Sequence, residues 1–177
     1  ILAPTMAGLA KDGLDYRGAL YVGIMLTRSG PQVLEYNARF GDPETQAVLP
    51  LLDADLLTLA ADCAAGKLQD GPVAVKPGAC VAITLSTPGY PDSPRPGAVL
   101  DVSGAEGLRD VLIFHAGTKR DGDIWRSTGG RVLTVVGRGA DPAEARERAY
   151  AAVAKLKVPG LHYRRDIAAK ALGRTVA

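Results

Sequence analysis

The clearest pattern of apolar and polar positions near the start of the chain is a hairpin between residues 18 and 38. Residues 18–27 form an apolar run rich in strand-forming side chains, and residues 31–38 alternate apolar with polar positions. The Ser29–Gly30 pair between them is typical of a tight turn. Because the first run is apolar on both of its faces, we expect it to be buried on both sides, whereas the second strand presents a polar face.

Two short helices are expected next. Asp42 precedes Pro43 and Glu44, an order that predicts a helix start in which the aspartate accepts backbone amide hydrogens and the proline is the first helical residue. The first helix should span residues 43–49, and a second should begin near residues 53–55 and end at Gly66. We expect both helices to cover the hairpin.

The apolar period lapses between Gly66 and Gly78, which marks the expected boundary between two structural units. The rest of the chain favours strands, followed by a long helix with Asp141 and Glu144 as its capping residues and an apolar period that continues to Leu156. The expected strands are residues 80–86, 98–102, 111–116, 124–127 and 131–136. The pattern as a whole predicts an α+β fold.

Composition excludes several classes of protein. With 47% hydrophobic and 23% charged residues the chain is typical of folded globular proteins. Its net charge of +2 provides no broad basic surface, so we expect neither a nucleic acid nor a membrane as partner. The two cysteines, Cys63 and Cys80, fit a reducing cytoplasm better than a disulfide scaffold. No apolar run approaches the roughly 20 residues of a membrane helix.

Polar side chains on the second predicted strand are the first candidate for chemistry. Glu35, Asn37 and Arg39 are spaced two apart, and the period of a strand would place all three on one face. A carboxylate and an amide oxygen suit Mg²⁺, and an arginine suits phosphate, so the set predicts a polyphosphate site. Gly41 permits a tight turn into the helix start at residues 42–45, which is suited to a small anion. The alternative is a solvated Glu35–Arg39 ion pair beside a capped helix.

A resemblance to a known family favours the polyphosphate site. Residues 34–46 are similar to the signature of phosphoribosylamine–glycine ligases, in which the run from Arg39 to Glu44 is close to family-specific. Glutamate and asparagine at this spacing alone would indicate only the ATP-grasp superfamily. Further similar motifs follow in the expected order, at residues 89–91, 115–118, 129–133, 149–150 and 163–167.

The resemblance implies an ATP-grasp fold, in which nucleotide lies between two antiparallel-sheet lobes. Residues 1–66 would be the second lobe, and residues 78–177 a small, strand-rich C-terminal domain with one long helix. The chain opens on Ile1 in mid-pattern, and nothing in it corresponds to the family's amino-terminal domain or to the earlier lobe with its phosphate-binding lysine. We therefore expect a fragment that lacks the N-terminal portion of the same enzyme and is inactive alone.

The family's roles transfer to this sequence through the matching motifs. Glu35 and Asn37 match metal ligands that bridge the ATP phosphates through Mg²⁺ or Mn²⁺, and Leu34, on the opposite face, would pack near the nucleotide. The residues expected to act in catalysis are Arg39, at the transferring phosphoryl group, with Asp42 and Glu44. The expected substrate-binding residues are Gly41, Asp42, Pro43, Glu44, His115, Gly117, Thr118, Gly130 and Arg131.

The later motifs also have structural interpretations. His115 is either a ligand near the ribosylamine phosphate or a polar strand end. The glycines before Arg131 either cradle a sugar phosphate or form a plain turn. Residues 164–166 are a binding cluster or a solvated group of charges, and Trp125 is expected to be a packing anchor rather than a stacking platform.

The implied activity is an ATP-dependent ligation of glycine to 5-phosphoribosylamine through a glycyl phosphate, in purine biosynthesis. The implied partners are ATP, glycine and 5-phosphoribosylamine, and the expected protein is a cytoplasmic monomer or weak dimer. One alternative is another ATP-grasp carboxylate–amine ligase, such as a formate- or bicarbonate-using purine enzyme or a biotin carboxylase. The other is a noncatalytic module that binds nucleotide or packs against another subunit.

Overall fold

The computed structural model describes residues 1–173, which form two compact units. The first unit comprises residues 1–42 and 52–75, and the second comprises residues 43–51 and, of the described chain, residues 76–173. The domain limits expected from the sequence, 1–66 and 78–177, refer to family domains and not to these compact units, so they stay a prediction. Residues 174–177 of the expected second domain lie outside the described part.

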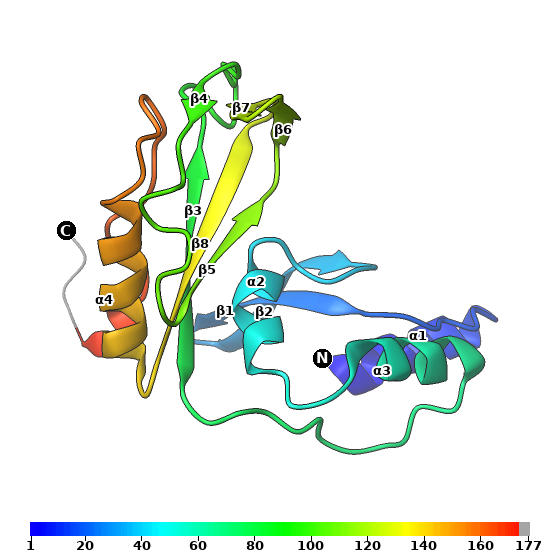
Figure 1. The fold of residues 1–177 in the computed structure, drawn as a ribbon. Coiled ribbons are helices and arrows are strands. Elements are labelled where there is room, and N and C mark those ends of the chain that lie inside the picture. Colours follow the sequence, from blue (N-terminus) through cyan, green and yellow to red (C-terminus); the bar gives the residue numbers. More distant parts are fainter. Residues whose placement is uncertain (174–177) are drawn as a thin grey trace. The chain divides into compact units, whose positions relative to one another are not determined.

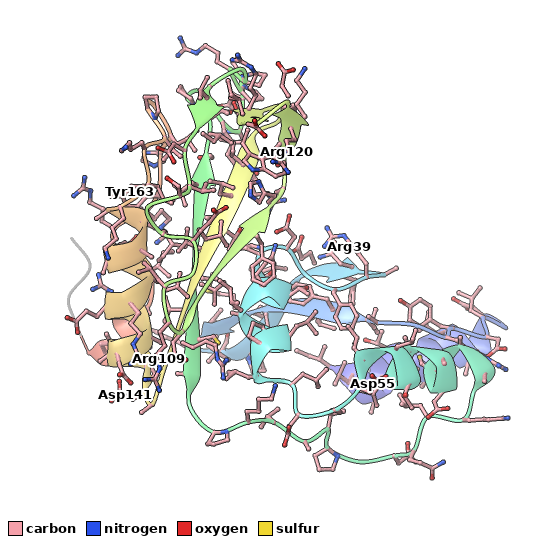
Figure 2. The ribbon with its side chains drawn as sticks, in the orientation of Figure 1. Arg39, Asp55, Arg109, Arg120, Asp141 and Tyr163 are labelled. Carbon is pink, nitrogen blue, oxygen red and sulfur yellow. The ribbon has the colours of Figure 1, made fainter. Side chains whose placement is uncertain are left out.

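The first unit contains a two-stranded antiparallel hairpin and two helices (Figure 1). Its elements are α1 (Leu2–Lys11), β1 (Tyr21–Thr27), β2 (Gly30–Asn37) and α3 (Leu56–Ala65). The hairpin and α3 confirm the sequence pattern, whereas α1 was not expected. The Asp55 carboxylate begins α3 by accepting the Thr58 amide hydrogen at 2.6 Å, and Gly66 ends the helix at a φ of 69°. Asp55 is labelled at the start of α3 in Figure 2.

Two expectations for the hairpin were wrong. The first strand is not buried on both sides, because residues 24–27 of β1 are exposed and the Leu26 side chain is 83% exposed. An apolar pattern shows that a surface is suited to burial, but it does not show that the same part of the chain supplies the cover. The turn residues are Arg28 and Ser29, and Gly30 already pairs with Thr27 as the first residue of β2.

The second unit holds the larger part of the fold, and with the first it confirms the α+β class. Its elements are α2 (Glu44–Val48), the 3-10 helix η1 (Leu49–Leu51), β3 (Ala79–Ser86), β4 (Val99–Leu100), β5 (Val111–His115), β6 (Thr118–Asp121), β7 (Ile124–Ser127), β8 (Arg131–Gly139), α4 (Pro142–Val153) and the 3-10 helix η2 (Lys170–Leu172).

Two three-stranded antiparallel sheets organise the second unit. One has the strand order β3-β8-β5, and the other has the order β4-β7-β6. Helix α4 packs along the first sheet, as Figure 1 shows. The hydrophobic core includes residues of β3, of β8 and of one face of the helix. Its most buried members include Ile83, Leu85, Val132, Val135, Ala145, Ala149 and Ala152.

Small residues allow α4 to approach β8 closely. A Cβ atom at Gly137 would lie 2.2 Å from the Ala145 carbonyl oxygen, and one at Gly139 would lie 2.5 Å from the Ala145 nitrogen. Ala145 and Ala149 are themselves fully buried on the facing side of the helix. Since interiors are close-packed, the absence of side chains at these positions sets the distance between helix and sheet.

The long helix begins as the sequence predicted. The Asp141 carboxylate accepts the amide hydrogens of Ala143 and Glu144 at 2.8 and 2.9 Å, and the Glu144 carboxylate accepts the Ala140 amide at 2.6 Å. The Ala143 and Glu144 amides are among those that the first helical turn leaves without partners, and the Glu144 contact fixes the backbone just before the helix. Asp141 is labelled at this end of α4 in Figure 2. The helix ends at Val153, earlier than its apolar period suggested.

Helix α2 begins at Glu44, one residue later than predicted, with Pro43 as its N-cap residue. Within the second unit the helix contacts β3 and β8. Its expected position over the hairpin, which belongs to the first unit, stays a prediction. Within residues 1–173 no helix has both the length and the apolar character needed to cross a bilayer.

The strands of the second unit follow the predicted ranges, with three differences. β4 is limited to two residues, β8 continues to Gly139, and β6 was not predicted. β6 is the polar run Thr118–Asp121, which forms a hairpin with β7 across Gly122 and Asp123. A short polar edge strand has no apolar alternation, so its pairing cannot be recognised from the sequence.

We predict that Gly137→Ala destabilises the protein. The added methyl group must displace the backbone of α4, and overpacking of this kind costs about 1–3 kcal/mol. Urea unfolding followed by circular dichroism measures the loss. Ala151→Ser, on the exposed side of the same helix, is the matched control and should change the free energy of unfolding by less than about 0.5 kcal/mol. Equal stability of both variants would contradict the packing argument.

Candidate functional site

The hairpin places Glu35 and Asn37 on one face. Pairing is regular over the end of β2, where Glu35 lies opposite Gly23 and Asn37 lies opposite Tyr21. Because side chains alternate along a strand, Glu35 and Asn37 project to the same side, and their cross-strand partners share that side. The Glu35 side chain is exposed and Asn37 is half-buried.

Tyr36, between these two residues, marks the opposite face of the hairpin. Its hydroxyl group lies 2.9 Å from the Thr5 hydroxyl of α1, so this face contacts the helix. Alternation along the strand therefore directs Glu35 and Asn37 away from this contact with α1. On the polar face of the hairpin, Glu35 and Asn37 each present an oxygen atom that can bind a metal ion.

Arg39 does not join the other two on the strand, as the spacing had suggested. β2 ends at Asn37, and Arg39 lies beyond it in a bend, where its guanidinium donates to the Phe40 carbonyl at 2.8 Å (Figure 2). Its side chain is exposed. Glu35 and Asn37 therefore share a strand, whereas Arg39 lies in the loop that follows it.

Leu34 is the extra residue of a β-bulge. Gly23 pairs with Glu35 and Ile24 pairs with Val33, so Leu34 has no partner in the register. Alternation is broken at this point and cannot fix the face on which Leu34 lies. Its side chain is 64% exposed, and its contact with a nucleotide remains a prediction.

The Glu35 and Asn37 pair has the donor chemistry of a magnesium site. Both supply hard oxygen ligands, and Mg²⁺ is commonly held by one or two such protein ligands together with waters and substrate phosphates. Two protein oxygen ligands leave most of the octahedral shell of Mg²⁺ to water and phosphate, so the pair fits a metal that is also bound by a phosphate ligand. Across residues 1–173 no group of three or more His, Cys, Asp or Glu residues is arranged to hold a metal ion.

The motif from Gly41 to Glu44 runs through the point where the chain passes from the first unit to the second. Gly41 is buried and Asp42 is exposed at the end of the first unit, and Pro43 and Glu44 begin the segment that belongs to the second. Helix α2 has five residues, so its amino end is little more than a single turn. Roles for these residues stay predictions.

Three backbone segments of the second unit meet in what we term the loop cluster, made of residues 87–90, 115–118 and 128–131. The Gly117 amide donates to the Arg131 carbonyl at 2.9 Å, and the Thr128 amide donates to the Gly117 carbonyl at 2.7 Å. The Thr87 amide donates to the Gly130 carbonyl at 2.8 Å. The structure thus brings the predicted residues from His115 to Thr118 together with Gly130 and Arg131.

His115 is held on two sides within this cluster. Its Nδ1 atom lies 3.1 Å from the Thr118 hydroxyl, and its ring lies against that of Trp125 with the centroids 4.1 Å apart. Burial lowers the pKa of the His115 imidazole below its ordinary value, although the Glu106 carboxylate opposes this effect. The neutral ring is therefore favoured, and it can form hydrogen bonds without adding charge.

The glycines of the loop cluster are explained in part by the protein's own packing. A Cβ atom at Gly130 would lie 2.3 Å from the Tyr90 ring, and one at Gly117 would lie 2.7 Å from the Arg131 carbonyl oxygen. Gly130 therefore makes room for Tyr90. This favours the structural interpretation of that glycine, and its contact with a sugar phosphate stays a prediction.

The charges of residues 164–166 form an ion pair on the surface. Arg164 makes two contacts with the Asp166 carboxylate, at 2.9 and 2.5 Å, and these hydrogen bonds lower the pKa of Asp166. The segment is held to α4 because the Tyr150 hydroxyl donates to the Arg164 carbonyl at 2.8 Å. Trp125 packs against the hydrophobic core, as predicted for an anchor.

Sequence reasoning missed two neighbours of the candidate residues. Tyr21 and Gly23 lie opposite Asn37 and Glu35 in the hairpin. Tyr90, which belongs to the motif at residues 89–91, lies over Gly130. The strand register would have identified Tyr21 and Gly23, but a bulge next to Leu34 shifts that register and leaves no signature in the sequence.

Comparisons with known proteins agree with the motifs. Residues 80–170 match the family described as phosphoribosylglycinamide synthetase, C domain, and residues 1–45 match the family described as phosphoribosylglycinamide synthetase, ATP-grasp (A) domain. The two matches follow the order of the expected lobe and terminal domain.

Proteins of similar sequence match nearly all of this chain. It is 43% identical over 173 residues to phosphoribosylamine–glycine ligase of Chlorobaculum tepidum, covering 97% of this chain and 41% of the relative. It is 46% identical to the ligase of Mycobacterium bovis, covering 97% and 40%. The chain thus spans about two-fifths of the length of the curated relatives that it matches.

Solved structures show the same relation. The crystal structure of phosphoribosylamine–glycine ligase from Thermotoga maritima superposes with a TM-score of 0.78 at 37% identity, covering 92% of this chain and 40% of the other. The biotin carboxylase domain of Hydrogenobacter thermophilus 2-oxoglutarate carboxylase, solved with MgADP, ADP and bicarbonate, superposes with a TM-score of 0.61 at 15% identity, covering 90% and 36%. The second likeness concerns the fold alone. With its fold, its hairpin motif and the match over residues 80–170 in agreement, this chain belongs to the phosphoribosylglycinamide synthetase family, the phosphoribosylamine–glycine ligases.

Proposed function

We propose that this chain is the carboxy-terminal part of an ATP-dependent ligase that joins glycine to 5-phosphoribosylamine in purine biosynthesis. Residues 1–66 are the second lobe of its ATP-grasp domain, and residues 78–177 are its C-terminal domain. The observation that carries the proposal is the shared face of Glu35 and Asn37 in a hairpin that bears the family motif. The chain alone, at about two-fifths of the relatives' length, is expected to be inactive.

The reaction has two steps. A carboxylate oxygen of glycine attacks the terminal phosphorus of ATP, the bond from that phosphorus to ADP breaks, and glycyl phosphate forms. The ribosylamine nitrogen then attacks the acyl carbon, the bond to phosphate breaks, and the nitrogen loses a proton as the amide forms. No protein nucleophile is required, so the protein acts by positioning the substrates and neutralising charge.

The residues of the hairpin supply part of that charge control. The Glu35 carboxylate and the Asn37 amide oxygen would hold the Mg²⁺ or Mn²⁺ ion that accompanies ATP. When bound, this ion would supply positive charge for the transferring group. Arg39, in the loop after β2, binds the same group through its planar guanidinium, while Leu34 packs near the nucleotide. The MgADP in the structurally similar biotin carboxylase domain is in keeping with this assignment.

The remaining assignments concern the two other substrates. Gly41, Asp42, Pro43 and Glu44 shape the binding of glycine and of the attacking amine. His115, Gly117, Thr118, Gly130 and Arg131 bind the ribosylamine phosphate, and the convergence of their backbone segments in the loop cluster supports this assignment. The protein works in the cytoplasm as a monomer or weak dimer, and its two cysteines are free thiols.

Other ATP-grasp ligases fit less well. The relatives at 43% and 46% identity are phosphoribosylamine–glycine ligases, whereas the biotin carboxylase domain shares 15% of its residues with this chain. Glutamate and asparagine at the same spacing serve the whole superfamily, but the run from Arg39 to Glu44 distinguishes this family.

Glu35→Gln in a full-length ligase that carries this sequence tests the metal assignment. The amide keeps the shape of the side chain but removes its negative charge, so we expect turnover to fall by about 100-fold or more. Steady-state kinetics measures the loss, and circular dichroism should show an unchanged fold. Asp70→Asn, an exposed carboxylate in the same unit, is the control and should keep full activity. Near-normal turnover of Glu35→Gln would refute the assignment.

His115→Ala tests the ribosylamine site. Loss of a hydrogen bond to a charged phosphate should raise the KM for 5-phosphoribosylamine by about 10-fold or more and leave the KM for ATP unchanged. Because burial lowers the pKa of His115, the ring stays neutral, and we expect the same ratio of KM values at pH 7 and at pH 8.5. His162→Ala, at the chain's other histidine, should change neither constant. A variant with altered stability but normal KM values would show that His115 is structural.

A further inference from the structure

Gly23 occupies an unusual position in the hairpin. In β1 and β2, all of whose residues the structure describes, Gly23 alone is buried, while most of its neighbours are exposed. It lies directly opposite Glu35 in the strand register. A glycine has no side chain of its own to bury, so its low exposure means that another group lies over its Cα atom.

That group is the Glu35 side chain. A Cβ atom added to Gly23 would lie 2.9 Å from Glu35 Cγ, 3.6 Å from Oε1 and 3.7 Å from Cδ. The first distance is shorter than van der Waals contact between carbon atoms. The glutamate therefore folds across the neighbouring strand and uses the space that the missing side chain leaves.

The backbone does not explain the glycine. The φ of Gly23 is not positive, whereas Gly30 at the start of β2 has a φ of 97°. An alanine would be accommodated by the main chain at position 23 and is at least as favourable as glycine in a strand. Glycine is thus required at position 23 because the Glu35 side chain approaches its Cα atom closely.

The β-bulge acts on the same side chain. Leu34, the unpaired extra residue, immediately precedes Glu35, and the register shift lies between Gly23 and Ile24. Bulges change the direction of the side chains beside them and occur next to active sites. The bulge on β2 therefore sets the direction of the Glu35 side chain, and this side chain occupies the space above Gly23 on β1.

We propose that Gly23 is a positioning residue for the Glu35 carboxylate, and that its missing side chain fixes where this carboxylate presents its oxygens to the divalent cation. The inference rests on the metal role of Glu35 in the proposed function. Gly23 itself touches neither metal nor substrate. A side chain at position 23 moves the carboxylate, and a misplacement of about 1 Å in a catalytic group reduces rates by about 100-fold.

Gly23→Ala in a full-length ligase that carries this sequence tests the proposal. Affinity for Mn²⁺ in the presence of ADP, measured by electron paramagnetic resonance, should fall by about 10-fold or more, and turnover at saturating Mg²⁺ should fall by about 10- to 100-fold. The KM for glycine should change by less than about 2-fold, since the metal contact alone is altered. The melting temperature should stay within about 3 °C of the parent.

Gly8→Ala is the matched control. Gly8 lies in α1 of the same unit, its φ is negative, and an added Cβ atom would meet no atom within 4 Å. This variant should retain the Mn²⁺ affinity and turnover of the parent. A large drop in the melting temperature of Gly23→Ala would identify Gly23 as a structural residue and overturn the proposal.

The Glu35→Gln variant separates the two possible failures. If Glu35→Gln is inactive while Gly23→Ala binds Mn²⁺ and turns over like the parent, the positioning role is wrong and the metal assignment stands. If Glu35→Gln keeps normal Mn²⁺ affinity and turnover, the metal assignment itself is wrong, and the positioning proposal is overturned with it.

Discussion

Antiparallel pairing between β1 and β2 determines which side chains of the hairpin can bind one ligand together. The pairing is regular from Glu35 to Asn37, so their oxygens share a face, while Tyr36 contacts α1 on the other. A shift of one residue would exchange these faces and separate the carboxylate from any phosphate-bound metal. The bulge at Leu34 and the gap above Gly23 refine this arrangement, because they act on the direction of a single side chain.

Glycines also permit close packing in the second unit, where they bring backbone segments together. Gly137 and Gly139 bring α4 close to β8, and Gly117 and Gly130 allow the segments of the loop cluster to meet. At each of these glycines, the neighbouring residue packs directly against the glycine backbone because no side chain lies between them. The resulting loops are held by main-chain hydrogen bonds, so a ligand that binds them meets a preformed surface with little conformational entropy left to lose.

Sequence patterns predicted the elements that depend on local chemistry. Asp55, Gly66 and Asp141 act where capping rules placed them, and most strands of the second unit fall within one to three residues of their predicted ranges. The patterns failed where packing and pairing decide: α2 begins one residue later than predicted, and residues 24–27 of β1 are exposed although their apolar pattern indicated burial. The pair Glu35 and Asn37 was predictable from strand alternation, but Arg39 was misplaced because no local signal marks where β2 ends.

Direct observation of the metal in a full-length ligase that carries this sequence would test the account most simply. In a crystal structure with ADP and Mg²⁺, a carboxylate oxygen of Glu35 and the amide oxygen of Asn37 should each lie about 2.1 Å from one magnesium ion that also binds a phosphate oxygen. A magnesium ion held by other residues, or a Glu35 side chain turned to the face of Tyr36, would contradict it.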